Sequence, residues 1–223
     1  MSFDRIAPHY RWLEAVTFGT ALQKARTRWI EEISAPKTVL IVGEGNGRFL
    51  RKCLRVHRNA AVDCVDTSAR MLERARRYVD EGANRVRFFQ EDILSWTPPG
   101  SYDLLVTNFF LDCFGPGELK LIVRKLAQAA TPGAYLLLAD FSVPETFLAR
   151  VHAKIWLAAM YWFFRAAAGI RATRLVDPTT ELEANGFVRL TRSHWRLGLV
   201  KSDLWQRQHE SIQVGYSLRG RDR

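Results

Sequence analysis

The stretch TVLIVGEGNGRFL, residues 38–50, decides the fold of this chain when it is taken together with AVDCVD at residues 61–66. An apolar run that predicts a buried strand breaks into a glycine-rich turn, and a helical segment follows. A second apolar run then ends at Asp66. Strand, glycine turn, helix, strand and acid is the order with which a parallel α/β sheet holds a nucleoside-containing ligand. Glycines let the backbone approach the ligand, and the acid accepts hydrogen bonds from ribose hydroxyls.

The spacing of the glycines distinguishes between nucleoside-containing cofactors. A dinucleotide fingerprint, G-x-G-x-x-G, needs a third glycine where this chain has Arg48, and the chain has no G-x-x-x-x-G-K-[ST] phosphate loop. The pattern is G-x-G-x-G instead, with Gly43, Gly45 and Gly47. S-adenosylmethionine has a ribose but no phosphate, so it suits this turn together with Asp66.

Three further strands are predicted downstream, and each ends in residues suited to a ligand. They are Val86–Phe89 before Gln90-Glu91-Asp92-Ile93, Tyr102–Thr107 before Asn108-Phe109-Phe110, and Tyr135–Ala139 before Asp140, the last after a turn at residues 131–134. In this interpretation the Asp92 carboxylate accepts a hydrogen bond from an adenine amino group, and Ile93 packs on the ring.

With these pieces in order, the chain resembles the class I S-adenosylmethionine-dependent methyltransferases. The matching pieces are VLIVGEGNGRFL (39–50), VDCVDTSARMLERAR (62–76), FFQEDI (88–93), YDLLVTNFFLDCF (102–114) and TPGAYLLLADF (131–141). The likeness covers roughly residues 1–200, and its motifs specify the superfamily but not the substrate. It implies an α/β fold: a Rossmann-like, seven-stranded mixed sheet with helices on both faces and an antiparallel last strand.

A narrower likeness lies at the amino terminus, where FDRIAPHY (3–10) is similar to the opening of the ubiquinone/menaquinone-biosynthesis methyltransferases, as is ADFSVP (139–144) to their fifth strand. Two departures limit this likeness. Ile41 stands where that group has an acid before the glycine turn, and its Tyr-x-x-Leu-x-x-Ser segment is not recognisable. The resemblance therefore carries over fold and cofactor, but not quinone synthesis.

The predicted site residues follow from these motifs and the resemblance. Cofactor binding is expected from Tyr10, Gly43, Glu44, Gly45, Gly47, Asp66, Thr67, Met71, Asp92, Ile93 and Asn108. Acceptor chemistry is expected after the fourth strand, from Asn108 and Asp112 beside Cys113, and from His9 in the amino-terminal segment. The sulfonium carries an activated methyl group, so the protein needs mainly to align a nucleophile with it and to exclude water.

Composition is that of an ordinary globular protein. The 223 residues are 48% hydrophobic and 25% charged, which is compatible with one sizeable core. We expect a helical lid segment at residues 1–34, an S-adenosylmethionine-binding domain at 35–218 and a loose basic tail at 219–223. Three cysteines without CxxC spacing, and no apolar signal run at the start, favour a cytoplasmic protein. The dispersed histidines predict no metal site.

Two features bear on partners: a net charge of +10 and an apolar helix predicted over residues 147–164. No nucleic-acid motif accompanies the charge, so no nucleic acid is expected. The run 155–164 is apolar almost all round, too short to span a bilayer, and flanked by Arg150, Lys154 and Arg165. These features are compatible with peripheral contact with the inner membrane surface. The alternatives are a cover helix on the sheet, a homodimer contact, or a roof over a lipophilic pocket.

Two function classes remain at this point. The first is an S-adenosylmethionine-dependent methyltransferase that acts by in-line transfer on a small, lipophilic acceptor, namely an amine, a phenol or quinone precursor, or a lipid head group. The second is a catalytically silent S-adenosylmethionine-binding protein that acts through a partner, which the missing acid at Ile41 leaves open.

Overall fold

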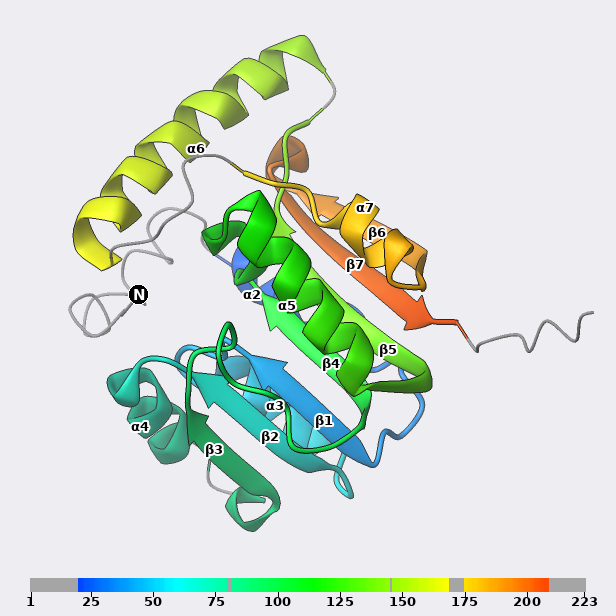
Figure 1. Ribbon diagram of the computed structural model, residues 1–223. Coiled ribbons are helices and arrows are strands. Elements are labelled where there is room, and N and C mark those ends of the chain that lie inside the picture. The colour runs from blue at the N-terminus through cyan, green and yellow to red at the C-terminus, as the bar shows by residue number, and fades with distance from the viewer. Residues whose placement is uncertain (1–19, 80–81, 145, 169–174, 209–223) are drawn as a thin grey trace, which may run out of the picture.

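A single mixed sheet of seven strands organises the protein, as the computed structural model shows (Figure 1). The structure describes residues 20–79, 82–144, 146–168 and 175–208, with side chains at 152, 159 and 161–168 excepted. The strands are β1 (Thr38–Val42), β2 (Ala61–Asp66), β3 (Val86–Gln90), β4 (Tyr102–Asn108), β5 (Ala130–Phe141), β6 (Phe187–Trp195) and β7 (Val200–Arg207). Their order across the sheet is β3-β2-β1-β4-β5-β7-β6.

The strand directions confirm the predicted mixed topology. Strands β1 to β5 are all paired in parallel, whereas β7 is antiparallel to β5 on one side and to β6 on the other. The first strand, β1, pairs with both β2 and β4, so the chain reverses its direction of travel across the sheet at this point. Ligands of open α/β sheets bind outside the carboxyl ends of the strands at such a switch point.

Helices cover both faces of the sheet, as predicted. They are α2 (Ala21–Thr27), α3 (Arg48–Val56), α4 (Ala69–Tyr78), α5 (Pro116–Ala129), α6 (Phe147–Ala168) and α7 (Thr179–Ala184), with short 3-10 turns η1 (Ala83–Arg85), η2 (Leu111–Cys113) and η3 (Arg196–Gly198). Figure 1 shows α5 and α7 in front of the sheet and α3 behind it.

Side chains of the strands contribute alternately to two apolar layers, because successive residues of a strand point to opposite faces of the sheet. In β1, Leu40 and Val42 join the layer under α5, while Val39 and Ile41 join the layer under α3 and α4. Ile41 is therefore part of the core. An acid at this position would be buried among apolar side chains.

Two boundaries differ from the prediction. Within the expected helical segment 1–34, the described part is helical only at α2, and turns follow it. The expected turn at residues 131–134 is instead the first part of β5. A register shift between Tyr102 and Leu104 and a positive φ of 81° at Gly133 let the strand continue through it. The tail 219–223 lies outside the described residues.

Buried ion pairs connect the last two strands. On β7, the Asp203 carboxylate accepts two hydrogen bonds from the Arg192 guanidinium of β6, at 2.6 and 2.8 Å. Lys201, only 2% exposed, lies 4.0 Å from Asp203 and donates a hydrogen bond of 3.2 Å to Asp177. This edge of the sheet therefore depends on opposite charges that meet inside the protein.

Candidate functional site

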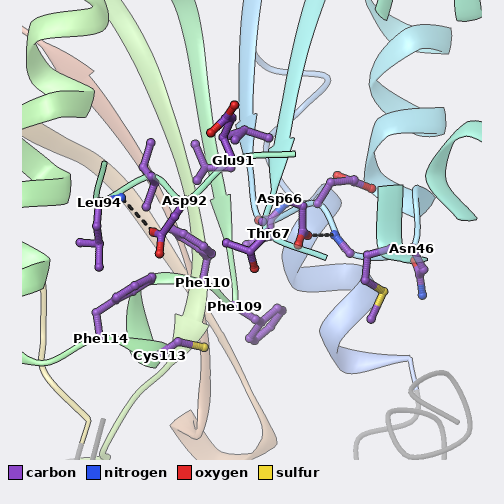
Figure 2. A pocket seen from close by; sticks show the side chains of 18 of the residues that line it. Asn46, Asp66, Thr67, Glu91, Asp92, Leu94, Phe109, Phe110, Cys113 and Phe114 are labelled. Atoms are coloured by element: carbon purple, nitrogen blue, oxygen red, sulfur yellow. Dashed lines mark hydrogen bonds between the residues drawn. The ribbon is translucent and has the colours of Figure 1, made fainter. Parts of the chain in front are cut away.

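A pocket lies at the carboxyl ends of β1 to β4, at the switch point of the sheet (Figure 2). Its wall combines the glycine turn after β1, the end of β2, the loops after β3 and β4, and one residue of α2. The lining residues are Arg26, residues 42–46, residues 65–67, Met71, residues 91–94, residues 108–110, Cys113, Phe114 and Glu118.

The glycine turn owes its spacing to two close approaches. At Gly43, with φ 71°, an added Cβ would lie 2.3 Å from a ring carbon of Phe110, so only glycine lets the loop after β4 come this near. At Gly47, with φ 83°, an added Cβ would lie 2.7 Å from the backbone of Ala75 on α4. Gly47 does not line the pocket, and its place in the motif is explained by the packing of α3 on α4.

Asp66 fastens the end of β2 to the glycine turn. One carboxylate oxygen accepts a hydrogen bond from the Gly45 backbone N–H at 3.3 Å (Figure 2), and the other accepts from the Ser68 N–H at 2.9 Å. Ser68 in turn caps α4 by accepting from the Met71 N–H at 3.2 Å. The carboxylate is therefore held at the pocket wall, where it can accept from ligand hydroxyls.

The loop after β3 forms the opposite wall of the pocket, and hydrogen bonds from α5 stabilise it. Asp92 accepts a hydrogen bond from the Leu94 N–H at 3.0 Å (Figure 2), while Ile93 is buried. The ammonium group of Lys125, on α5, donates hydrogen bonds to three backbone carbonyls of this loop. They are those of Ile93, Leu94 and Trp96, at 2.9, 2.8 and 2.7 Å. A carboxylate beside an apolar side chain is thus presented on a fixed backbone.

Glu44 is a half-buried residue of the glycine turn that precedes α3. Its Oε1 accepts hydrogen bonds from the backbone N–H groups of Phe49 and Leu50, at 3.1 and 3.0 Å, and so caps the helix. Burial raises the pKa of Glu44 to about 7, against the opposing effect of these N–H groups and of the Arg26 charge. Its second oxygen, Oε2, is buried without a hydrogen-bond partner among the described residues.

Other unpartnered polar atoms face the same pocket. The side-chain amide nitrogens of Asn46 and Asn108 and the Asn108 amide oxygen are buried without partners among the described residues, and Asn108 is only 8% exposed. Leaving such groups unpaired costs free energy, so they point to a ligand. The guanidinium of Arg26 lies over the Phe109 ring and also lines the pocket. Hydrogen-bond donors therefore lie in the same pocket as the Glu44 carboxylate. This donor set fits an amino-acid group, whose ammonium and carboxylate carry opposite charges.

Aromatic rings enclose the side of the pocket beyond β4. Phe109 packs on Phe141 with ring centroids 5.2 Å apart, and Phe110 meets Phe114 edge to face at 5.0 Å. Phe109 adopts a φ of 53°, a backbone conformation that costs free energy and recurs at ligand sites. This part of the pocket suits an apolar group.

A buried acidic pair lies behind this aromatic side. Burial raises the pKa of Asp112 to about 6, and burial together with the Asp112 charge raises that of Asp140, at the end of β5. The Cys113 thiol donates to Asp112 Oδ1 at 3.6 Å, and burial raises the thiol pKa well above its ordinary value. Cys113 is therefore a neutral thiol in the pocket wall, and Asp112 lies behind it without lining the pocket.

The structure brings most of the predicted site residues together. Those that line the pocket are Gly43, Glu44, Gly45, Asp66, Thr67, Met71, Asp92, Ile93 and Asn108, whereas Gly47 and Asp112 lie next to it. His9 and Tyr10 lie outside the described residues. Sequence reasoning missed Arg26 and Asn46. Arg26 belongs to a helix far from the glycine motif in sequence, so no local spacing indicated it.

Comparison with known proteins identifies the region that carries the pocket. Residues 39–133 match the family described as a methyltransferase domain. The carboxy-S-adenosyl-L-methionine synthase of Dichelobacter nodosus is 31% identical over 129 residues, which cover 57% of this chain and 51% of that protein. The malonyl-[acyl-carrier protein] O-methyltransferase of Halalkalibacterium halodurans is 33% identical over 129 residues, which cover 56% and 45%. The chain spans about half the length of these curated relatives.

Solved structures share the fold. The N-methyltransferase NodS of Bradyrhizobium japonicum, in complex with S-adenosyl-l-homocysteine, aligns with a TM-score of 0.60 at 14% identity and covers 84% of each chain. Residues 39–133 therefore resemble a methyltransferase domain, and the fold of the chain is the Rossmann-like fold that NodS has.

Proposed function

We propose that this protein is an S-adenosylmethionine-dependent methyltransferase that acts on a small, lipophilic acceptor. The observation that carries the proposal is the set of buried, unpartnered polar atoms in a pocket at the switch point of the sheet. The resemblance of residues 39–133 to a methyltransferase domain supports the reaction class. The aromatic side of the pocket supports an apolar acceptor.

Each part of the cofactor has a chemically matched group in the pocket. Asp66 accepts hydrogen bonds from the ribose hydroxyls, and Asp92 with Ile93 holds the adenine. Glu44 Oε2 accepts from the ammonium, and Arg26 neutralises the carboxylate at the amino-acid end. When bound, the cofactor supplies an activated methyl group. The protein holds the ligand and excludes water from the pocket.

The acceptor side of the pocket favours an amine among the three classes of acceptor. The Asn108 amide can both donate to and accept from the acceptor, and so orient it. Asp112, ionised above about pH 6, adds negative potential behind Cys113. A nitrogen that becomes positively charged as it is methylated gains from that potential. A phenol gains nothing from it, since its oxygen carries negative charge before transfer.

Methyl-labelled S-adenosylmethionine, incubated with the protein and a cell extract, tests this function. Label in a product that partitions into organic solvent supports the proposal. Label only in a small polar product contradicts the lipophilic acceptor. No transfer by a protein that binds S-adenosylhomocysteine supports the silent cofactor-binding alternative instead.

Glu44→Gln is expected to weaken binding of S-adenosylhomocysteine about tenfold to a hundredfold, in line with about 1.5–3 kcal/mol for a hydrogen bond to a charged group. The amide keeps the shape and the cap on α3 but turns the Oε2 acceptor into a donor that faces the ammonium. Calorimetry should find unchanged affinity for 5′-methylthioadenosine, which shares the adenosine and sulfur but lacks the amino-acid group. Equal losses for both ligands would contradict this role of Glu44.

The same contact makes binding dependent on pH. In the empty pocket burial holds the pKa of Glu44 at about 7, with Arg26 lowering it and Asp66 raising it. A bound ammonium favours the ionised carboxylate, so binding releases a proton and affinity rises with pH. Between about pH 5.5 and 7.5 we expect about a tenfold gain. Glu44→Gln should flatten this profile, and any slope that persists in the variant belongs to another group such as Asp112. A profile identical in the two proteins would exclude Glu44 as the source.

A further inference from the structure

Exposed apolar side chains gather at one end of the molecule. Ten large hydrophobic residues are exposed among the described ones, and six of them fall between residues 143 and 156. Leu148 is 82% exposed, and Leu197, on the turn between β6 and β7, is 80% exposed. We call the α6 patch the set Val143, Phe147, Leu148, Val151, Ile155 and Leu197. A concentration of this kind marks an interaction surface, whereas single exposed apolar residues do not.

The turn η3 adjoins the segment that leads into α6, although the two are far apart in sequence. The Ser142 N–H donates to the Leu199 carbonyl at 2.9 Å, and the Ser142 hydroxyl donates to the Gly198 carbonyl. Arg196 and Leu197 both adopt positive φ, at 53° and 55°, which is costly for residues other than glycine. The fold therefore holds an exposed leucine and an arginine in an unfavourable conformation beside Val143.

Helix α6 presents two different sides. Ala153 and Leu157 are buried in the core layer that also contains Cys113 and Phe114 of the pocket wall. Phe147, Val151 and Ile155, spaced by four residues, share the exposed side. Figure 1 shows that helix α6 extends past the sheet.

The described stretches that carry α6 and the turn η3 contain cations but no acidic residue. Residues 146–168 and 187–202 contain no acidic residue. Glu145, which stands in the sequence between β5 and α6, lies outside the described residues. Arg150, Lys154 and Arg196 are exposed. No helix among the described residues combines the length and apolarity needed to cross a bilayer. Cations beside exposed apolar side chains are the composition of a helix that lies in a membrane interface.

We propose that the α6 patch docks the protein on the surface of an anionic lipid bilayer. Arg150, Lys154 and Arg196 meet lipid phosphates, while Leu148, Phe147 and Leu197 enter the acyl boundary. The chain reaches α6 from the carboxyl end of β5, the same edge of the sheet that carries the pocket, so docking brings the pocket close to membrane-dissolved molecules. A symmetric contact between two copies would oppose identical cations and is therefore disfavoured.

Cosedimentation with vesicles tests the proposal without reference to methyl transfer. The probes are phosphatidylcholine vesicles and vesicles with about 30% phosphatidylglycerol, each at about 50 and about 500 mM salt, since added salt screens lipid charge. We expect binding to the anionic vesicles at low salt, less at high salt, and little to neutral vesicles.

Matched variants locate the contact. Arg150→Glu with Lys154→Glu should lower the partition coefficient at least about 30-fold, as expected for two cations at about 1 kcal/mol each. Lys120→Glu with Arg124→Glu, an exposed pair of the same spacing on α5, is the control. Leu197→Ser should weaken binding, whereas Leu190→Ser, on exposed β6 surface, should not. All six substituted residues are exposed, and the melting temperature checks that each of the four variants is folded.

Salt-sensitive binding that the patch variants lose and the controls keep supports the proposal. Absence of vesicle binding, or equal loss in the control variants, overturns it. A dimer in analytical ultracentrifugation that Leu148→Ser dissociates also overturns it, because a second copy then covers the patch. Binding of S-adenosylhomocysteine is measured separately, so failure of membrane docking is distinguishable from failure of the proposed methyltransferase function.

Discussion

Asp66→Ala is expected to weaken binding of S-adenosylhomocysteine by about 2–4 kcal/mol, or about 30-fold to 1,000-fold, because two charge-assisted hydrogen bonds to the ribose are lost. The same carboxylate holds the Gly45 and Ser68 N–H groups, so its loss also loosens the glycine turn.

Calorimetry with two ligands gives this prediction a distinct signature. S-adenosylhomocysteine and 5′-methylthioadenosine share the ribose, so both should lose affinity in Asp66→Ala, whereas Glu44→Gln should affect only the first. Glu73→Ala, at an exposed carboxylate paired with Arg77 on α4, is the control and should bind both ligands normally. Unchanged affinity in a folded Asp66→Ala protein would remove Asp66 from the ribose site.

Asp203→Asn is expected to lower the free energy of unfolding by about 3 kcal/mol. The amide fits the same space but leaves the Arg192 guanidinium and the buried Lys201 ammonium without their shared counter-charge. Breaking a buried pair costs about 3–5 kcal/mol. The lower end applies because Lys201 keeps its hydrogen bond to Asp177.

Urea denaturation measures this loss as a lower transition midpoint at an unchanged slope. The matched control is Glu32→Gln, which breaks an exposed pair with Arg28 at 2.7 Å and should cost less than about 1 kcal/mol. Equal costs for the buried and the exposed pair would show that burial of the Asp203 cluster contributes nothing to stability.

The sheet was predictable because its signals are local. Each apolar run, such as residues 38–42, is bounded by turn residues and alternates with helical sequence, and short connections then restrict the topology. The strand through residues 131–134 was not predictable, since Pro132-Gly133 signals a turn. The segment belongs to β5 because the strand continues through a register shift opposite Tyr102 and Leu104, which depends on the tertiary fold.

Part of the candidate site follows from the same local logic. Asp66 and Asp92 stand directly after strands, and the carboxyl ends of parallel strands meet at one edge. Arg26 and the cap that Glu44 forms depend on how α2 and α3 pack, which no spacing in the sequence encodes. The burial of Asp112 behind Cys113 likewise depends on tertiary packing. The prediction of Asp112 as a catalytic residue used only its position after β4, which does not reveal this burial.

The hydrogen bonds from Lys125 to the loop after β3 affect how much each part of a bound ligand contributes to its binding free energy. Three carbonyls of that loop accept hydrogen bonds from Lys125 on α5. If adenine binds here as proposed, it meets a preorganised wall and loses little of its binding free energy to ordering the protein. Fragments that carry only adenine and ribose should consequently bind with high efficiency per atom, which makes adenosine a sound starting point for inhibitors of this pocket.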